Sequence, residues 1–206
     1  LAVLREVISM HRSGSKDKNA STKQQILRAA RKLFAQHGYE ATTTRMITEQ
    51  VGVSQSAISF HFDSKENLCR AAVEYTARLI DAYYEEVYGE IEQAFKAGAA
   101  TEETAVLLIS RLLAKQISLV FDPRNQNSVN LALKDKSFPP IAQGILPKEL
   151  FDRVEGQLSR LILAYSKSGN AVWAAAVSRA ANGAIFAFFE KPSLMREMRS
   201  LSSEGD

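Results

Sequence analysis

Apolar residues recur every three or four positions along most of this chain, and this spacing constrains its fold more than any other feature. The first such stretch places Ile26, Ala30, Leu33 and Phe34 on one side of a helix. The sequence shows neither the alternation of apolar and polar positions that marks a half-buried strand nor an internal repeat. With 206 residues and 46% hydrophobic content, the chain can bury a sizeable core. We therefore predict an all-α fold.

Capping residues and glycines divide the first part of the chain into helices. The expected N-caps are Ser21, which forms a capping-box spacing with Gln24, and Thr43, Ser54 and Ser64. Gly38 and Gly52 are expected to end the first and second helices. Three short helices with a tight turn between the second and third are typical of a helix-turn-helix unit. We predict this domain over residues 21–67, after a flexible basic leader over residues 1–20 in which Met10 is the candidate natural start.

A long fourth helix opens the second predicted domain, residues 68–206. Further helices are expected over residues 103–121, 127–136, 150–165 and 170–190, with a proline-rich loop at 138–147. From the sequence we expect no apolar run as long as the roughly 20 residues that a membrane-spanning helix needs, and therefore no membrane partner. The lone cysteine, Cys69, fits a reducing cytoplasm and a buried, apolar role.

Basic residues are concentrated in the first third of the chain. The whole chain carries a formal net charge of +3, whereas residues 1–75 hold eleven Lys and Arg against seven Asp and Glu. This excess predicts an anionic partner for the N-terminal part alone. A charged face that is merely solvated explains the same numbers.

The third helix carries short polar side chains where a plain surface helix would carry Glu and Lys. A recognition helix in the major groove reads base edges with such groups, because Gln can bond adenine and Ser suits either base. Gln55, Ser56 and Ser59 fall near one outward side. Ser54 and Thr43 stand at helix N-termini, which bind phosphate well. A capped surface helix that avoids charge is the alternative interpretation.

The stretch "ILRAARKLFAQHGYEATTTRMITEQVGVSQSAISFHFDSKENL" resembles the DNA-binding domain of the TetR family of bacterial transcription regulators. The matching motifs are Phe34, Gly38 and Tyr39 at the end of the first helix, Thr42 and Thr43 at the opening of the second, the turn Val51 to Ser54, and Phe62, Lys65, Glu66 and Leu68 at the end of the stretch. The sequence departs from the pattern at Ser59, where Tyr is usual, and at His61 and Met46.

The resemblance, together with the reading of the third helix, predicts a DNA-binding surface. Its candidate residues are Thr43, Thr44, Arg45, Ser54, Gln55, Ser56, Ser59, Phe60, His61 and Lys65. Arg45, His61 and Lys65 are expected to contact phosphates and so to fix the register on the duplex. The resemblance also implies a C-terminal helical domain for ligand binding and dimerisation. The segment "RAANGAIFAFFEKPSL" is similar to the last helix of the CecR-like subgroup.

Two further sets of residues are predicted in the C-terminal domain. A ligand cavity between the fourth helix and the helices at 103–121 and 127–136 would be lined by Tyr83, Tyr84, Tyr88, Phe95, Leu112, Gln116 and Phe121. A dimer interface rich in small residues would contain Phe151, Leu158, Ile162, Trp173, Val177, Ala180 and Ala184. Ordinary core packing within a single chain is the alternative for both sets.

The sequence lacks the patterns that enzymatic chemistry requires. The three histidines, at positions 11, 37 and 61, are scattered, and there is no nucleophile elbow, phosphate loop or Cys/His metal cluster. We expect no cofactor, no metal and no catalysis. The predicted function is a ligand-responsive transcriptional repressor in the cytoplasm that binds a palindromic operator as a homodimer. The alternative is an architectural or division-linked DNA-binding protein that answers to a protein partner and has no small-molecule effector.

Overall fold

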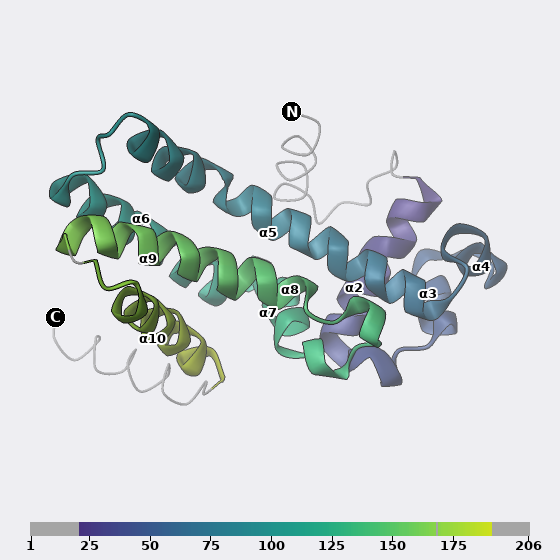
Figure 1. Ribbon diagram of the computed structural model, residues 1–206. Helices are drawn as coiled ribbons and strands as arrows, with labels where there is room; N and C mark the ends of the chain where they lie inside the picture. The colour runs from purple at the N-terminus through teal and green to yellow at the C-terminus, as the bar shows by residue number, and fades with distance from the viewer. Residues whose placement is uncertain (1–20, 168, 191–206) are drawn as a thin grey trace, which may run out of the picture. The chain divides into compact units, whose positions relative to one another are not determined.

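The computed structural model describes residues 21–167 and 169–190, which form helices joined by turns (Figure 1). The α-helices are α2 (Thr22–Ala41), α3 (Thr44–Val51), α4 (Ser56–Phe62), α5 (Lys65–Lys96), α6 (Glu102–Phe121), α7 (Gln126–Leu133), α8 (Ile145–Pro147), α9 (Arg153–Ser166) and α10 (Ala171–Glu190). Single turns of 3₁₀-helix cover Pro123–Asn125, Asp135–Ser137 and Pro140–Ala142, and a π-helical turn covers Lys148–Asp152. The all-α prediction is confirmed, and the predicted leader lies outside the described residues.

These helices form two compact units. Among the described residues, the first unit contains 21–85 and 126–150, and the second contains 86–125 and 151–190. The packing therefore divides α5 near residue 85, not at its start, where the predicted domain boundary at 67/68 lies. The reason is that α7 and the turns after it pack with the N-terminal helices.

The first unit is built around α2. The four apolar residues predicted to face inward on this helix are all buried, as are Ile47 of α3 and Ile58 and Phe62 of α4. Both hydrogen bonds of the predicted capping box form at Ser21 and Gln24. Gly38 leaves the helix with φ 80°, in the left-handed region where a residue with a β-carbon is strained. This break, as predicted, ends the regular part of the first helix, although a last turn follows as far as Ala41.

Two cationic side chains join α2 to distant parts of the first unit. Arg31 Nη2 donates to Ser128 Oγ of α7 at 2.7 Å, and its Nε donates to Thr76 Oγ1 of α5 at 3.2 Å. Lys134 Nζ donates to the backbone oxygen of Ala35 at 2.7 Å. Because this carbonyl lies near the end of the regular helix, the ammonium group also meets the negative end of the helix dipole. These contacts hold α7 on the helix that supports the predicted DNA-binding surface.

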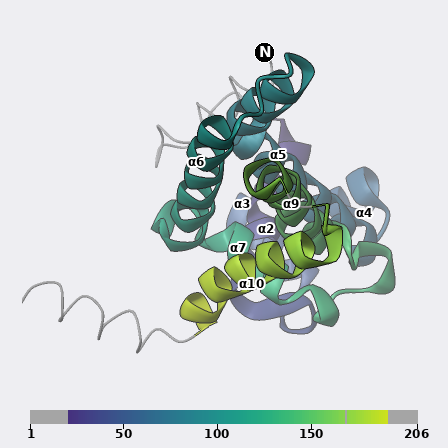
Figure 2. The same ribbon diagram turned by 60° about the vertical axis from the view of Figure 1, so that its left-hand side comes forward.

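In the second unit, α9 packs against both α6 and α10 (Figures 1 and 2). Buried side chains from each helix form the core, including Val87, Ile91, Leu108, Leu112, Leu119, Val154, Leu158, Leu161, Ala174 and Ile185. A buried polar pair joins α6 to α10 in this core, where Gln116 Nε2 donates to Asn182 Oδ1 at 2.7 Å. Both amides are fully buried, so the bond satisfies groups that would otherwise be costly to desolvate.

Helix α6 corrects one expectation from the sequence. It has 20 residues and a mean hydropathy of 1.6 over its most apolar 18-residue window, so by length and composition alone it could cross a membrane. A single such helix is weak evidence, since the core helix of a globular unit passes the same test. Within the described part of this chain, α6 packs on α9 and α10, and its Arg111 pairs with Glu90 of α5 at 2.9 Å.

Candidate nucleic-acid interface

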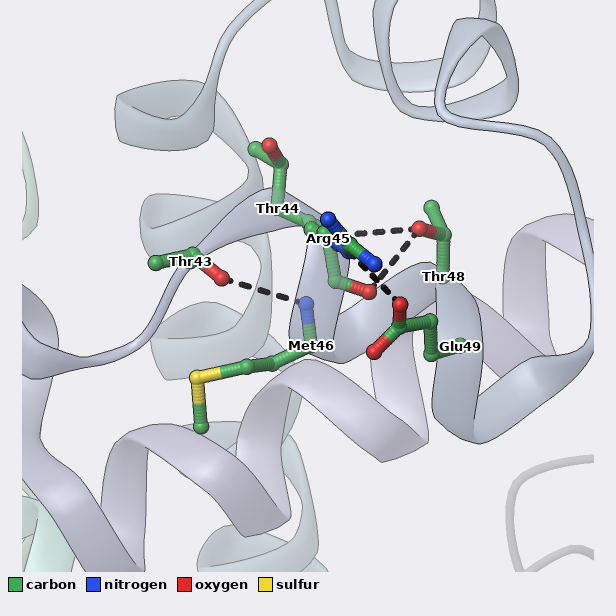
Figure 3. A network of polar contacts seen from close by, with 6 residues as sticks. All are labelled: Thr43, Thr44, Arg45, Met46, Thr48 and Glu49. Atoms are coloured by element: carbon green, nitrogen blue, oxygen red, sulfur yellow. Dashed lines mark hydrogen bonds and ion pairs between the residues drawn. The ribbon is translucent and has the colours of Figure 1, made fainter.

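Hydrogen bonds of Thr43 and Thr48 fix the first turn of α3. Thr43 Oγ1 accepts the backbone N–H of Met46 at 3.2 Å and forms the predicted N-cap. Thr48, one turn on, is buried and its hydroxyl donates to the backbone oxygen of Arg45 at 3.0 Å. Figure 3 shows these bonds, with the side chain of Thr44 pointing away from them. The first turn of α3 thus presents exposed Thr43, half-buried Thr44 and exposed Arg45 on a rigid frame.

A glycine makes the tight turn between α3 and α4. Gly52 adopts φ 82° and ψ 36°, the left-handed conformation of a helix C-cap, and its N–H donates to the backbone oxygen of Thr48 at 2.8 Å. The N–H of Val53 donates to the same oxygen at 3.1 Å. The predicted helix-turn-helix is therefore present, with α3 as its first helix and α4 as its second.

Helix α4 begins later than predicted. The sequence predicts Ser54 as the N-cap, but the helix starts at Ser56 with Gln55 in the cap position. Ser54 Oγ lies 2.8 Å from Ser56 Oγ, so the two hydroxyls are hydrogen-bonded to each other. Neither residue is lost from the predicted surface, because both remain exposed.

One face of α4 is buried and the other is open. Ile58 and Phe62 retain 2% and 5% exposure, which fixes the rotation of the helix about its axis. Gln55, Ser56, Ser59 and Phe60 consequently point outward, and Phe60 is 83% exposed. The outward face thus combines an amide, two hydroxyls and one aromatic ring, and it lacks charged side chains.

The end of α4 is a strained turn. Asp63 has φ 66° and ψ −44°, and the N–H of Ser64 donates back to the backbone oxygen of Phe62 at 2.8 Å. This is the geometry of a γ-turn in its less favourable form. Ser64 then caps α5 as predicted, since its Oγ accepts the N–H of Asn67 at 3.1 Å.

A cluster of Tyr39, Lys65 and Glu66 fastens the start of α5 to the end of α2. Tyr39 Oη donates to Glu66 Oε1 at 3.0 Å, and Lys65 Nζ lies 4.1 Å from the centre of the Tyr39 ring. Burial first, and then the bond to Glu66, raise the pKa of Tyr39 above its ordinary value. The backbone N–H of Glu66 itself, the Ser64 hydroxyl and the Tyr39 hydroxyl, in that order, lower the pKa of Glu66. The cluster positions Lys65 at the edge of the α4 surface.

The structure brings the predicted DNA-binding residues together on the two helices of this motif and the start of α5. They are exposed or half-buried, and His61 is among the half-buried ones, with its ring 4.9 Å from that of Phe60. Sequence reasoning missed Glu49, whose Oε1 accepts a 2.7 Å bond from Arg45 Nε and raises the pKa of Arg45. The spacing of four residues between opposite charges on one helix could have shown this pair. It also missed Asp63, Tyr39 and Glu66 as the frame of the site.

This part of the chain is similar in sequence to known proteins. Residues 26–72 match the family described as "Bacterial regulatory proteins, tetR family". The chain is 46% identical over 70 residues to the HTH-type transcriptional repressor AcnR of Corynebacterium glutamicum, an alignment that covers 34% of this chain and 37% of AcnR. These likenesses support a transcriptional regulator of the TetR type, with the family match confined to residues 26–72.

Two further TetR-related likenesses extend beyond the DNA-binding domain. The HTH-type transcriptional dual regulator CecR of Shigella flexneri is 27% identical over 149 residues, which cover 72% of this chain and 66% of CecR. The TetR transcriptional regulator from Legionella pneumophila has a similar structure, with a TM-score of 0.57 over 91% of this chain and 98% of that one. At 16% identity this second likeness shows the fold alone. These relatives are transcriptional regulators, not enzymes.

The residues predicted to line a TetR-type ligand cavity fall in both units. Tyr83 and Tyr84 belong to the first unit, and the other five belong to the second. Tyr84 and Leu112 are fully buried core residues, and Gln116 is already engaged by Asn182. Arg160 lies 4.4 Å from the Phe95 ring and Arg153 lies 4.6 Å from the Tyr88 ring, while Phe121 is half-buried. The cavity remains a prediction, and the Gln116 amide is not free to bind a ligand.

The predicted dimer residues divide into two groups. Trp173, Val177, Ala180 and Ala184 lie on the exposed side of α10. Leu158 and Ile162 of α9 are buried in the core of their own chain, at 1% and 8% exposure, and the Phe151 ring packs on Phe186 at 4.7 Å. Leu158 and Ile162 therefore lie in the core of the second unit and Phe151 packs at its edge, because apolar spacing does not distinguish a core from a contact surface.

Proposed function

We propose that this protein is a ligand-responsive transcriptional repressor that binds a palindromic operator as a homodimer in the cytoplasm. The observation that carries the proposal is the outward face of α4. Its side chains are short, polar and uncharged around one exposed ring, while Ile58 and Phe62 hold the opposite face in the core. A helix presented in this way suits the major groove, where amides and hydroxyls can pair with base edges.

Phosphate contacts would come from the rim of this face. Arg45 is exposed at the start of α3, and Lys65 is held by the Tyr39 ring at the start of α5. The N-terminus of α3, where Thr43 already accepts one N–H, offers further backbone donors to an anion. Such contacts place the protein on the duplex without reading its sequence.

The exposed face of α10 supports dimerisation. Val172 is 81% exposed, Trp173 is 45% exposed, and the remaining exposed positions of this helix are mainly alanine. Small residues allow two helices to approach closely, and Trp173 with the exposed valines provides apolar area. A two-fold dimer would present two copies of α4, which must lie about 34–36 Å apart to read successive major grooves.

Helix α5 supports a response to ligand. It is a single helix of 32 residues that contributes to both units, so a ligand bound in the second unit can act on the start of α5 next to α4. The ligand must prefer one position of this helix over another, because a molecule that binds both equally shifts neither.

Operator binding by two variants tests the proposal. Gln55→Ala should lower the preference for operator over unrelated duplex, because it removes a base contact. Lys65→Ala should weaken binding to both duplexes and lower the slope of log affinity against log salt by about one. If both variants bind like the parent protein, the proposed surface is wrong. Unchanged operator binding across a screen of small molecules, with release by a protein partner, would favour the division-linked alternative.

A further inference from the structure

Phe60 is exposed at the centre of the surface that the proposed function assigns to DNA. Its side chain is 83% exposed, which makes it one of the two most exposed large apolar residues in the described chain. Its ring meets the ring of His61 edge-on, with 4.9 Å between the two ring centres, and otherwise faces outward from α4. An apolar ring left in water is unfavourable, so its exposure is informative about what meets this face.

The position of Phe60 on α4 places it among the groups proposed to read bases. Phe60 follows Ser56 by one helical turn, so the two side chains share a side of the helix. Ile58 and Phe62 occupy the opposite side and are buried. A duplex that accepts α4 in its major groove therefore meets the Phe60 ring directly.

The chemistry of phenylalanine restricts what it can contact there. The ring carries no donor or acceptor, so it cannot bond a phosphate oxygen or the polar edge of a base. The apolar group that the major groove offers is the C5-methyl of thymine. Neighbouring Gln55, Ser56 and Ser59 are polar, so this face lacks the contiguous apolar patch that a protein partner would cover.

We propose that Phe60 is a specificity-determining residue that selects thymine by packing against its C5-methyl group. This assignment rests on the proposed function and adds a base identity to it. Each operator half-site then contains a thymine opposite the Phe60 ring, and the selectivity comes from apolar contact, not from hydrogen bonding.

Replacing thymine with uracil tests the contact, because it removes the methyl group and leaves every hydrogen-bonding group of the base pair in place. The full chain is first used to select its operator from random duplexes, and each thymine of the operator is then replaced in turn. At one thymine per half-site, affinity should fall about fourfold, as expected when one methyl group loses its burial. Phe60→Ala should bind the thymine and uracil duplexes equally, and Phe60→Leu should keep part of the difference.

The outcomes separate this inference from the function on which it rests. If the chain enriches an operator but no uracil replacement weakens binding, or if Phe60→Ala keeps the full uracil effect, the thymine assignment is wrong and the proposed function stands. If the chain enriches no sequence, the proposed function fails, and the inference fails with it. Phe60 is exposed, so its replacement should leave the thermal unfolding midpoint unchanged, and that measurement excludes misfolding as a cause.

Discussion

At the scale of single residues, the candidate site is a set of exposed groups held by buried or strained neighbours. Phe60 and Gln55 face outward because Ile58 and Phe62 are anchored in the core. Lys65 is positioned by the Tyr39 ring, and Arg45 is paired with Glu49. Changes to these supporting residues should therefore alter DNA binding or stability in distinct ways.

Glu49 should weaken DNA binding in the parent protein. Its carboxylate competes with phosphate for Arg45 and repels the duplex, although an exposed pair of this kind adds little to folding. Glu49→Gln should therefore raise operator affinity about two- to fivefold at low salt, an effect of the size of one exposed charge interaction. Titration of a labelled duplex measures the change. Glu85→Gln, on the exposed side of α5, is the matched control, and an equal gain in both variants would show that net charge alone is responsible.

Asp63 should limit the stability of the first unit. Its φ of 66° is unfavourable for a side chain but open to glycine, so Asp63→Gly should raise the free energy of unfolding by about 1 kcal/mol. Urea denaturation measures this value. Asp63→Asn removes the charge and keeps the side chain, and it separates the two effects. Equal stability of the Gly and Asn variants would contradict the assignment of strain.

Glu66 should make the folded state sensitive to acid. Its pKa is lowered below the ordinary 4.5 when the chain folds, so its carboxylate favours the folded state above about pH 4.5. This contribution is lost as the pH falls through the lowered pKa. Below that pKa the Glu66 carboxyl is protonated in both the folded and the unfolded chain, so it no longer favours either state. The stability advantage of the parent over Glu66→Gln should thus shrink as the pH falls from about 5 through the lowered pKa of Glu66. An advantage that is constant across this range in urea denaturation would contradict the prediction.

At the scale of elements, local chemistry predicted the ends of the helices well. Ser21, Thr43 and Ser64 cap the helices they were expected to cap, and Gly52 ends α3, because each acts on a backbone group within four residues. The prediction that Ser54 caps α4 was wrong, because its hydroxyl is hydrogen-bonded to the Ser56 hydroxyl instead of to a backbone N–H. The candidate surface on α3 and α4 followed from these ends and from the spacing of buried positions.

Contacts between distant elements could not be predicted from the sequence in this way. The bond between Gln116 and Asn182 joins residues 66 positions apart, and Arg31 and Ser128 are 97 positions apart. Helical spacing marks Gln116 and Leu158 as inward-facing, but it does not show whether a cavity, a partner or the core of the same chain receives them. The assignment of α7 to the first unit could not be predicted for the same reason, since α7 packs on α2.

The pairing of α7 with α2 gives a prediction at this scale. Lys134→Met should lower the free energy of unfolding by about 1 kcal/mol, because it removes a charged donor from the carbonyls of Ala35 and Gln36. Amide hydrogen exchange should also become faster in α7. Lys136→Met, two residues on at an exposed position, is the control. Unchanged exchange in α7 would mean that Lys134 does not hold this helix.

At the scale of the whole molecule, binding to a two-fold symmetric operator requires two copies of the chain. Val177→Glu places a charge in the middle of the exposed side of α10 and should convert a dimer to a monomer in sedimentation experiments. The same variant should lose operator affinity, because two linked copies of α4 bind more strongly than one. Ser118→Glu, at an exposed position of α6, should leave the assembly unchanged. A dimer that survives Val177→Glu would place the interface elsewhere.

The central claim is that the outward face of α4 reads the base sequence of duplex DNA. Selection of duplexes from a random library, with the full chain and with a variant in which Gln55, Ser56 and Ser59 are all alanine, tests it most directly. The parent should enrich a two-fold symmetric sequence whose half-site centres lie about one helical turn, or a multiple of it, apart. The triple variant should bind DNA with little sequence preference. Enrichment of the same sequence by both proteins, or of none by the parent, would contradict the claim.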